Sequence, residues 1–455
     1  MNIYLDNMTQ DGNAQLFVNH YQDILKFNIN SGKWLIWDDI HWKPEIAHEK
    51  PELYVFRKFI QKMIQELSNL ESHEERDILN KWIKRSQTKH HMYDVLELAS
   101  SYREIQISQH HLDANPLYLN CLNGTINLET NAIHNHSKDD YLTRYIPVEY
   151  HKDEDCPFFL EFLNTITNSN QDVITYLQTA IGYSLTGLHS EEVLFFLYGT
   201  GKNGKTTFMN VLATLLGIYQ QRIGINSILQ SRNDRVKTEF AQLPGVRIVH
   251  TSEIPENRKL DESLVKDLTG GDPIRTRFLY KEWFEFKPVF KLWMFGNHKP
   301  IITGTDEGIW RRIKLIPFTI EIPEEKRLPR HIIEQKLNDE LSGILNWALE
   351  GCQYWLQHGL YEPVCIAEAT KIYRNEMNII ATFIDENCQL DNTCGILCSE
   401  LYDAYKVWSK QTNTFCYGKQ LFNKKLLETE SSLKKKRLSQ GISIIGISLK
   451  NKNTS

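Results

Sequence analysis

The sequence predicts an α/β protein whose core is a parallel β-sheet. Three apolar runs, at 193–198, 247–251 and 290–295, have the length of strands that are buried on both faces of such a sheet. Stretches of helical periodicity alternate with these runs, as is typical of sheets covered by helices. A glycine-rich loop directly follows the first run, so strand, loop and helix are expected to form one unit.

The composition indicates a multidomain globular protein. The chain has 455 residues, with 41% hydrophobic and 24% charged side chains, and a chain of this size corresponds to about three domains. The net charge of −5 hides an asymmetry, because residues 416–455 carry +7 and residues 1–415 carry −12. The total charge therefore does not exclude nucleic acid as a partner of one part of the chain.

Membrane insertion and secretion are not predicted. Apolar runs such as 193–198 are far shorter than the ~20 residues of a membrane span, and the N-terminus lacks the basic and apolar pattern of a secretory signal. The eight cysteines are scattered, which favours reduced thiols, and their spacing completes no zinc site. We expect a cytoplasmic protein without a membrane partner.

Residues 1–155 are predicted to form an α+β domain. A hairpin is expected within 28–42, helices over 51–101, and a second hairpin over 119–128 around Asn123-Gly124, a favoured turn pair. The region contains no recognisable catalytic constellation.

The loop after the first apolar run matches the phosphate-loop pattern GxxxxGK[ST]. Its glycines allow backbone N–H groups to point at phosphate oxygens, and the following helix adds the positive end of its dipole. Lys205 is expected to reach the β- and γ-phosphates, and the Thr206 hydroxyl to bind Mg²⁺. We therefore predict ATP and Mg²⁺ as cofactors. The predicted nucleotide-binding residues are Gly199, Thr200, Gly201, Lys202, Asn203, Gly204, Lys205, Thr206 and Thr207.

Polar residues end the second and third apolar runs. Glu253 follows the second run and is the candidate catalytic base and a candidate Mg²⁺ neighbour, although Ser252 stands where an acidic pair would have Asp. Asn297 follows the third run, where its amide is expected to contact the γ-phosphate or the attacking water. The alternative for Glu253 is an ordinary surface carboxylate in a loop.

Two adjacent arginines, Arg311 and Arg312, precede a further apolar strand. An arginine at a subunit boundary stabilises transition-state charge on a neighbouring nucleotide. Structural ion pairs are an equally good interpretation of the same two residues.

Residues 274–286 alternate like a strand pair and carry basic and aromatic side chains near the turn. Charge suits phosphates and rings suit bases, so this hairpin is a candidate for single-stranded DNA, with an unremarkable exposed hairpin as the alternative. The candidate contacts are Arg275, Arg277, Tyr280 and Lys281.

The basic tail is predicted to form helices over 399–408 and 417–428 and a hairpin over 434–449. Lysine suits phosphates and Gln or Asn suits base edges, so duplex DNA binding is favoured over a merely solubilising tail. The candidate contacts are Lys419, Gln420, Asn423, Lys424, Lys434, Lys435, Lys436 and Arg437.

The order of these motifs resembles the superfamily 3 helicases, a branch of the AAA+ ATPases. The match is closest to the satellite-phage and plasmid primase–helicase family, which includes the poxvirus primase–helicase. The motifs that carry this resemblance are Gly201-Lys-Asn-Gly-Lys-Thr206, Ser252-Glu253, Lys259-Leu-Asp-Glu262, Leu268-Thr-Gly-Gly-Asp272, Phe290-Lys-Leu-Trp293, Gly296-Asn-His-Lys-Pro300 and Gly304-Thr-Asp-Glu-Gly-Ile-Trp-Arg-Arg312. The Ser-Glu form of the second motif is usual in that family.

The resemblance implies an AAA+ ATPase domain at 156–355, preceded by a helicase-associated domain at 1–155 and followed by a C-terminal winged-helix domain at 356–455. It implies a ring, expected to be hexameric, with ATP between subunits and Arg312, or as second choice Arg311, reaching the neighbour's nucleotide. The hairpin with Lys281 would line the channel and draw one DNA strand in the 3′→5′ direction.

The function expected from this resemblance is an ATP-dependent DNA helicase that initiates replication of a mobile genetic element. Replication initiators of phage-inducible chromosomal islands are similar in plan. Larger relatives carry an upstream primase domain, so we expect primase activity from a separate partner. The alternatives are an AAA+ loader or defence ATPase that does not unwind DNA, and a DNA-binding scaffold with a vestigial ATPase.

Overall fold

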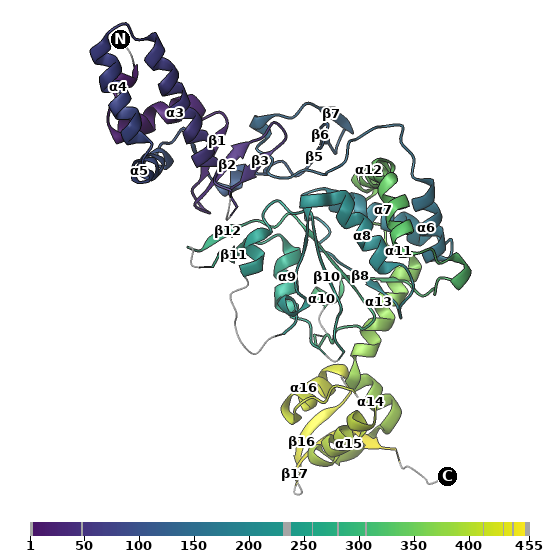
Figure 1. Cartoon of the computed structure of the whole chain (residues 1–455). Helices are drawn as coiled ribbons and strands as arrows, with labels where there is room; N and C mark the ends of the chain where they lie inside the picture. Colours follow the sequence, from purple (N-terminus) through teal and green to yellow (C-terminus); the bar gives the residue numbers. More distant parts are fainter. Residues whose placement is uncertain are drawn as a thin grey trace.

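The protein is built from an N-terminal helical unit, a central α/β unit and a small C-terminal unit (Figure 1). The structure is a computed structural model. It describes residues 3–46, 49–230, 238–256, 258–279, 282–304, 307–412, 414–430, 432–438 and 441–450.

The N-terminal unit packs helices against a four-stranded sheet of order β3-β2-β1-β4. Its elements are α1 (Ile3–Asp6), α2 (Gln10–Tyr21), β1 (Leu25–Asn28), β2 (Lys33–Trp37), β3 (Trp42–Pro44), α3 (Pro51–Asn69), α4 (His73–Ser86), α5 (Lys89–Ser100) and β4 (Gln106–Ile107). The hairpin predicted within 28–42 is the β2–β3 pair, in which Trp37 faces Trp42. Phe17, Phe56 and Phe59 pack in its core.

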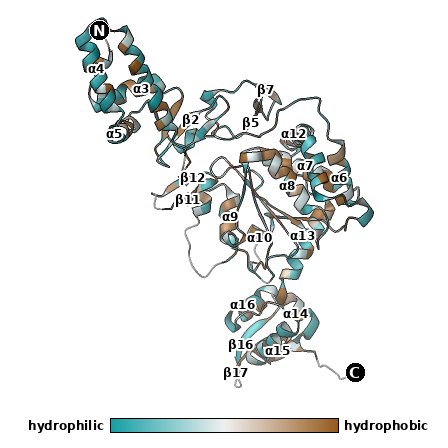
Figure 2. Cartoon of the chain, in the orientation of Figure 1, coloured by the Kyte–Doolittle hydropathy of each residue, from teal (hydrophilic) through white to brown (hydrophobic). Residues whose placement is uncertain are grey.

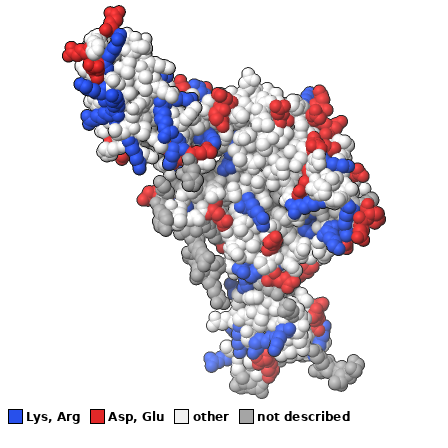
Figure 3. All heavy atoms as spheres, in the orientation of Figure 1, with Lys and Arg blue, Asp and Glu red and all other residues white. Residues whose placement is uncertain are grey.

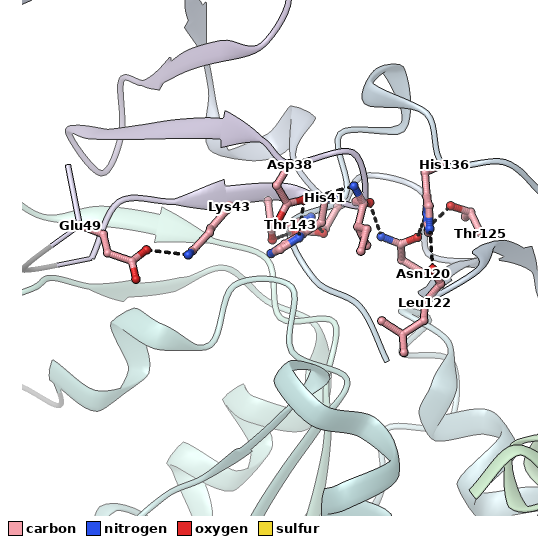
Figure 4. Close-up of polar contacts among 11 residues, drawn as sticks. Asp38, His41, Lys43, Glu49, Asn120, Leu122, Thr125, His136 and Thr143 are labelled. Atoms are coloured by element: carbon pink, nitrogen blue, oxygen red, sulfur yellow. Dashed lines mark hydrogen bonds and ion pairs between the residues drawn. The ribbon is translucent and has the colours of Figure 1, made fainter. Parts of the chain in front are cut away.

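A small three-stranded sheet joins this unit to the central one: β5 (Tyr118–Cys121), β6 (Gly124–Asn127) and β7 (Ala132–His134). The Asn120 amide, at the junction in Figure 4, donates to the Ile40 carbonyl at 2.7 Å and accepts from Thr125 at 3.1 Å. The buried Leu119 and Ile126 share a hydrophobic core with the central helices. The predicted domain 1–155 is therefore divided in its packing, because only residues up to about 105 have the separate core.

The central unit contains a five-stranded parallel sheet of order β14-β8-β13-β10-β9. Its strands are β8 (Leu194–Tyr198), β9 (Gln220–Arg222), β10 (Ile248–Ser252), β13 (Lys291–Gly296) and β14 (Ile313–Pro317). The three predicted apolar strands are β8, β10 and β13, and each begins one residue later than predicted. The mixed α/β architecture with a parallel sheet is confirmed.

Helices cover both faces because alternate strand residues point to opposite sides. Phe195 and Trp293 face one helical layer, whereas Phe196 and Met294 face the other. The first layer contains α6 (Pro157–Thr167), α7 (Gln171–Leu185), α8 (Lys205–Leu216), α11 (Arg330–Asp339) and α12 (Leu341–His358); the second contains α9 (Glu262–Gly270), α10 (Glu307–Trp310) and α13 (Val364–Met377). Brown hydrophobic residues accordingly gather on the central helices (Figure 2). The predicted hairpin at 274–286 forms β11 (Ile274–Thr276) and β12 (Phe284–Phe286).

The C-terminal unit has its own hydrophobic core, which begins at Ile379. Its elements are α14 (Ile379–Asn387), β15 (Cys388–Leu397), α15 (Cys398–Gln411), α16 (Lys419–Thr429), β16 (Lys434–Leu438) and β17 (Gly441–Leu449), with strand order β15-β17-β16. The preceding helix α13 packs into the central unit through Ile366 and Tyr373. The packing boundary therefore lies near 378 rather than at the predicted 356, because α13 serves the central core.

Two further features concern membrane spans and cysteines. Within the described ranges, no helix is long and apolar enough to cross a membrane. All eight cysteines are described and are free thiols.

Candidate nucleotide and nucleic-acid sites

The register of the central sheet aligns the ends of three strands at one edge. Gly296, the last residue of β13, pairs with Tyr198 at the end of β8, and Phe295 pairs with Ser252 at the end of β10. Gly199, Asn297 and Glu253 each follow these ends directly. The structure therefore brings the phosphate loop and both polar candidates to the same carboxyl edge, although the sequence separates them widely.

The phosphate loop turns tightly between β8 and α8. Gly201, Lys202 and Gly204 have positive φ angles of 121°, 49° and 80°, a conformation that favours glycine. A Cβ on Gly199 would lie 2.1 Å from the Phe318 carbonyl oxygen, so only glycine fits there. Asn203 fixes the loop to the end of β14, because its amide donates to the same carbonyl at 2.8 Å.

Lys205 starts α8 and is 4% exposed. Its ammonium donates to the Gly199 carbonyl at 2.8 Å and to Asn203 Oδ1 at 2.7 Å, so it lies over the interior of the loop. Burial lowers the pKa of the Lys205 ammonium to about 8. A desolvated cation inside a ring of backbone groups is well suited to bind a phosphate anion.

Thr200 is exposed on the loop, Thr206 is exposed at the second position of α8, and Thr207 follows it half-buried. Gly204 is the N-cap of α8, so the first-turn N–H groups lack intrahelical acceptors and lie beside these hydroxyls. These residues fit a magnesium nucleotide, because Mg²⁺ is commonly held by one hydroxyl or carboxylate together with phosphate oxygens and water. In the part of the chain that the structure describes, His, Cys, Asp and Glu form no cluster able to hold a metal by themselves.

Glu253 is exposed and has a φ of 62°. A left-handed backbone costs a non-glycine residue about 1 kcal/mol, and such strain concentrates at functional sites. The preceding Ser252 accepts a hydrogen bond from Arg222 at 3.0 Å. The strained backbone turns the chain out of the sheet directly after β10, which leaves the Glu253 carboxylate accessible at the carboxyl edge.

Asn297 is exposed at the end of β13. It lines a cavity of 380 Å³ together with Tyr198, His298, Lys299 and residues of the α13 end. His298 and Glu256 approach to 3.3 Å in this cavity, so the segments after β10 and β13 meet there.

The two arginines lie at the opposite edge of the sheet. Arg312 precedes β14, and Ile313 pairs with Leu194 at the start of β8. Five residues of β8 separate this edge from the phosphate loop, which is about 16 Å of strand. Neither arginine is therefore positioned next to the phosphate loop of its own chain.

Arg312 and Arg311 differ in their surroundings. The Arg312 side chain is 10% exposed and donates to Glu192 at 2.8 Å, to Thr269 Oγ1 at 3.2 Å and to the Gly308 carbonyl at 2.6 Å. The Arg311 side chain is 61% exposed and pairs with the same Glu192 carboxylate. The structure thus gives Arg312 partners within its own subunit and leaves most of the Arg311 side chain exposed.

The β11–β12 hairpin presents cations around an exposed ring. The guanidinium carbons of Arg275 and Arg277 lie 5.3 Å and 4.7 Å from the Trp283 ring centroid, and Trp283 is 41% exposed. Tyr280 and Lys281, the other two predicted contacts, lie outside the described residues. The sequence pattern did not single out Trp283, although its place two residues after Lys281 is a usable signal.

The C-terminal unit exposes its basic strand. Every residue of β16 is exposed, which includes Lys434, Lys435, Lys436 and Arg437. Lys419, Gln420 and Lys424 are exposed on α16, whereas Asn423 is half-buried. Figure 3 shows Lys and Arg gathered on one face of this unit. The predicted duplex-facing residues are thus accessible, with Asn423 the least so.

Comparisons with known proteins agree with the motif order. Residues 14–168 match the family described as "D5 N terminal like", and residues 197–312 match a family of unknown function. The chain is 29% identical to "Putative helicase L207/L206" of Acanthamoeba polyphaga mimivirus over 67% of this chain and 34% of that protein. It is 24% identical to "Putative primase C962R" of African swine fever virus (strain Badajoz 1971 Vero-adapted) over 84% of this chain and 43% of that protein.

A solved structure is also similar. "The A form apo structure of NrS-1 C terminal region-CTR" aligns with a TM-score of 0.47 and 11% identity, over 93% of this chain and 96% of that one. The chain spans about a third of the first curated relative and less than half of the second. The matches to a D5-like domain and to viral helicases and primases support a relation of this chain to the superfamily 3 helicase–primase family.

Proposed function

We propose that the protein is an ATP-dependent DNA helicase that moves 3′→5′ and initiates replication of a mobile genetic element. It would work as a ring, expected to be hexameric, with an AAA+ ATPase core and a C-terminal winged-helix unit that binds origin DNA. The observation that carries the proposal is the strand register at the carboxyl edge, which supports one ATPase site built from Lys205, Glu253 and Asn297.

The chemistry follows from the positions of these groups. Lys205 and the loop N–H groups would hold the β- and γ-phosphates, and Thr206 and Glu253 would hold Mg²⁺. Bound Mg²⁺ supplies charge neutralisation on the phosphate oxygens. Glu253 would orient and deprotonate the attacking water, and the Asn297 amide would donate a hydrogen bond to the γ-phosphate or to that water.

A second subunit would complete the site. Arg311 and Arg312 lie at the opposite edge of the sheet, so an arginine must come from a neighbouring copy to reach the nucleotide. The exposure of Arg311 favours it for this contact, while Arg312 would hold Glu192 in place.

Two surfaces support DNA as the substrate. Arg275 and Arg277 beside the exposed Trp283 suit one strand, because cations bind phosphates and an indole stacks on bases. The exposed β16 cations suit duplex DNA. The names of the viral relatives support helicase activity as well, and a separate primase remains part of the proposal.

Strand displacement tests the proposal. Purified protein, ATP and Mg²⁺ are mixed with duplexes that carry either a 3′ or a 5′ single-stranded tail. Release of a strand from the 3′-tailed duplex only is expected, and Lys205→Ala and Glu253→Gln should abolish it. Lys152→Ala, at an exposed position far from the loop in sequence, is the control.

The alternatives give different outcomes in the same experiment. ATP turnover that DNA stimulates without strand release would indicate a loader or defence ATPase. DNA binding with no turnover above that of Lys205→Ala would indicate a scaffold.

A further inference from the structure

The chain segments that follow Glu253 and Asn297 contact the C-terminal unit and the helix that connects to it. The two segments pair with each other: Ile301 N donates to the Arg258 carbonyl at 2.8 Å, and Leu260 N donates to the Ile301 carbonyl at 3.0 Å. These hydrogen bonds join the two segments, and each segment begins at a proposed catalytic side chain.

The last turn of the connecting helix α13 contacts the segment that follows Asn297. Lys299, two residues beyond Asn297, contacts Glu376 at 2.6 Å. The same ammonium lies 4.6 Å from the ring of Tyr198, the residue that precedes the phosphate loop. Tyr373, which is 1% exposed, donates to the Pro300 carbonyl. The end of α13 is thus packed against the carboxyl edges of β8 and β13 together.

The C-terminal unit itself contacts the segment after Asn297 at Thr303. Lys425 on α16 is 9% exposed and donates to the Thr303 carbonyl. On its other side, Thr303 donates through its N–H and hydroxyl to Glu262 at 2.7 Å and 3.0 Å. The Lys259 ammonium lies 4.0 Å from the ring centroid of Phe415 in the C-terminal unit. These contacts make both catalytic segments part of the interface between the two units.

We propose that Lys425 and Glu376 are positioning residues through which the C-terminal unit sets the alignment of Asn297 and Glu253. Binding of duplex DNA to the C-terminal unit would shift α16 and α13, and thereby change the rate of ATP hydrolysis. The inference rests on the proposed ATPase and duplex-binding functions. It goes beyond them because it assigns regulation of hydrolysis to a defined set of contacts.

The physical reason is strongest for Lys425, which is buried at 9% exposure, whereas Glu376 is 47% exposed and binds the less exposed Lys299. A buried ammonium bound to a carbonyl cannot move without leaving that acceptor unpaired, which is costly. A rotation of the C-terminal unit must therefore either carry the segment after Asn297 with it or break the Lys425 contact. Coupling of this kind requires a structural element with two arrangements, and both DNA binding and ATP hydrolysis must shift the balance between them.

Duplex-stimulated ATP turnover tests the inference. The rate of ATP hydrolysis by the full chain is measured with and without a linear plasmid duplex, for the wild-type chain, Lys425→Met and Glu376→Gln. Lys410→Met and Glu368→Gln, exposed on α15 and α13, are the matched controls. For both test variants, the stimulation ratio should fall towards one, whereas KM for ATP and duplex affinity should remain unchanged. Lys425→Arg should restore part of the stimulation.

The outcomes separate this inference from the proposed function. Wild-type stimulation retained in folded Lys425→Met and Glu376→Gln overturns the inference, as does a wild-type chain that turns over ATP without any response to duplex DNA. Thermal melting of each variant shows whether it is folded. If Lys425→Met is unfolded, the result for Glu376→Gln decides the inference. Absence of strand displacement alone would overturn the helicase proposal while leaving the coupling intact.

Discussion

Replacing Arg312 by alanine removes a guanidinium from three acceptors inside one subunit, whereas replacing Arg311 removes a largely exposed one. Arg312 contacts Glu192, Thr269 and the Gly308 carbonyl, and its side chain is 10% exposed. Loss of hydrogen bonds to a charged group and of a buried ion pair costs about 2–4 kcal/mol here, because Arg311 keeps part of the contact with Glu192. Arg311→Ala should cost no more than about 1 kcal/mol, as is usual for exposed ion pairs.

These free energies translate into separable melting temperatures. For a unit of this size, each kcal/mol lowers Tm by roughly 2–4 °C. Arg312→Ala is therefore expected to melt roughly 5–15 °C below the wild-type chain, and Arg311→Ala within a few degrees of it. Calorimetry at equal protein concentration measures both values.

ATP turnover then separates the structural role from the role in the neighbour's site. Arg311→Ala should lose turnover while keeping wild-type stability. Mixing it with Lys205→Ala should restore part of the activity, because mixed interfaces pair an intact loop with an intact Arg311. The assignment is refuted if Arg311→Ala turns over ATP normally, or if Arg312→Ala melts like the wild-type chain and alone abolishes turnover.

Three further predictions follow from burial and charge. Because the pKa of Lys205 is lowered to about 8, binding of an ATP analogue measured by calorimetry should weaken as pH rises above 8, and Lys205→Arg should remove this dependence. Burial lowers the pKa of His250 to about 4. The free energy of unfolding should therefore fall as pH drops from 6.5 towards 4, by about 2 kcal/mol at pH 5. Urea unfolding of His250→Gln should show a smaller loss over the same pH range. Changing the four exposed cations at 434–437 to alanine should leave the fold intact. The slope of log binding constant against log salt concentration, measured for duplex DNA by fluorescence anisotropy, should fall by up to about four. An unchanged slope would exclude β16 from the DNA contact.

Local sequence information was enough to predict the strands and the phosphate loop. The ends of β8, β10 and β13 lie within one residue of the predicted ends, because apolar runs bounded by turn residues are a local signal. The β11–β12 and β16–β17 hairpins were predicted for the same reason. Strand order was not predicted, and it is the order that places Asn297 beside the phosphate loop with Glu253 one strand further away.

Long-range contacts account for what the sequence did not reveal. Glu192 binds both arginines across about 120 residues of chain, and nothing in its local sequence distinguishes it from a surface carboxylate. Lys425 sits next to Lys424 in the sequence, yet one is buried against Thr303 and the other is exposed. Neighbouring helix positions differ by about 100° in direction, so only the position of the partner unit decides which lysine faces protein.

The placement of the two halves of the proposed site also constrains the assembly. The phosphate loop follows β8 at one edge of the sheet, and Arg311 precedes β14 at the other. A contact that brings Arg311 to a neighbour's loop joins two different surfaces. A two-fold dimer satisfies this contact only if both surfaces lie within one reciprocal interface, and otherwise the contact is head-to-tail. Head-to-tail contacts of this type produce a closed ring when the rotation per subunit divides a full turn and a filament when it does not. Light scattering across protein concentrations discriminates the two: a mass that reaches a plateau supports the ring, and a mass that keeps rising refutes it.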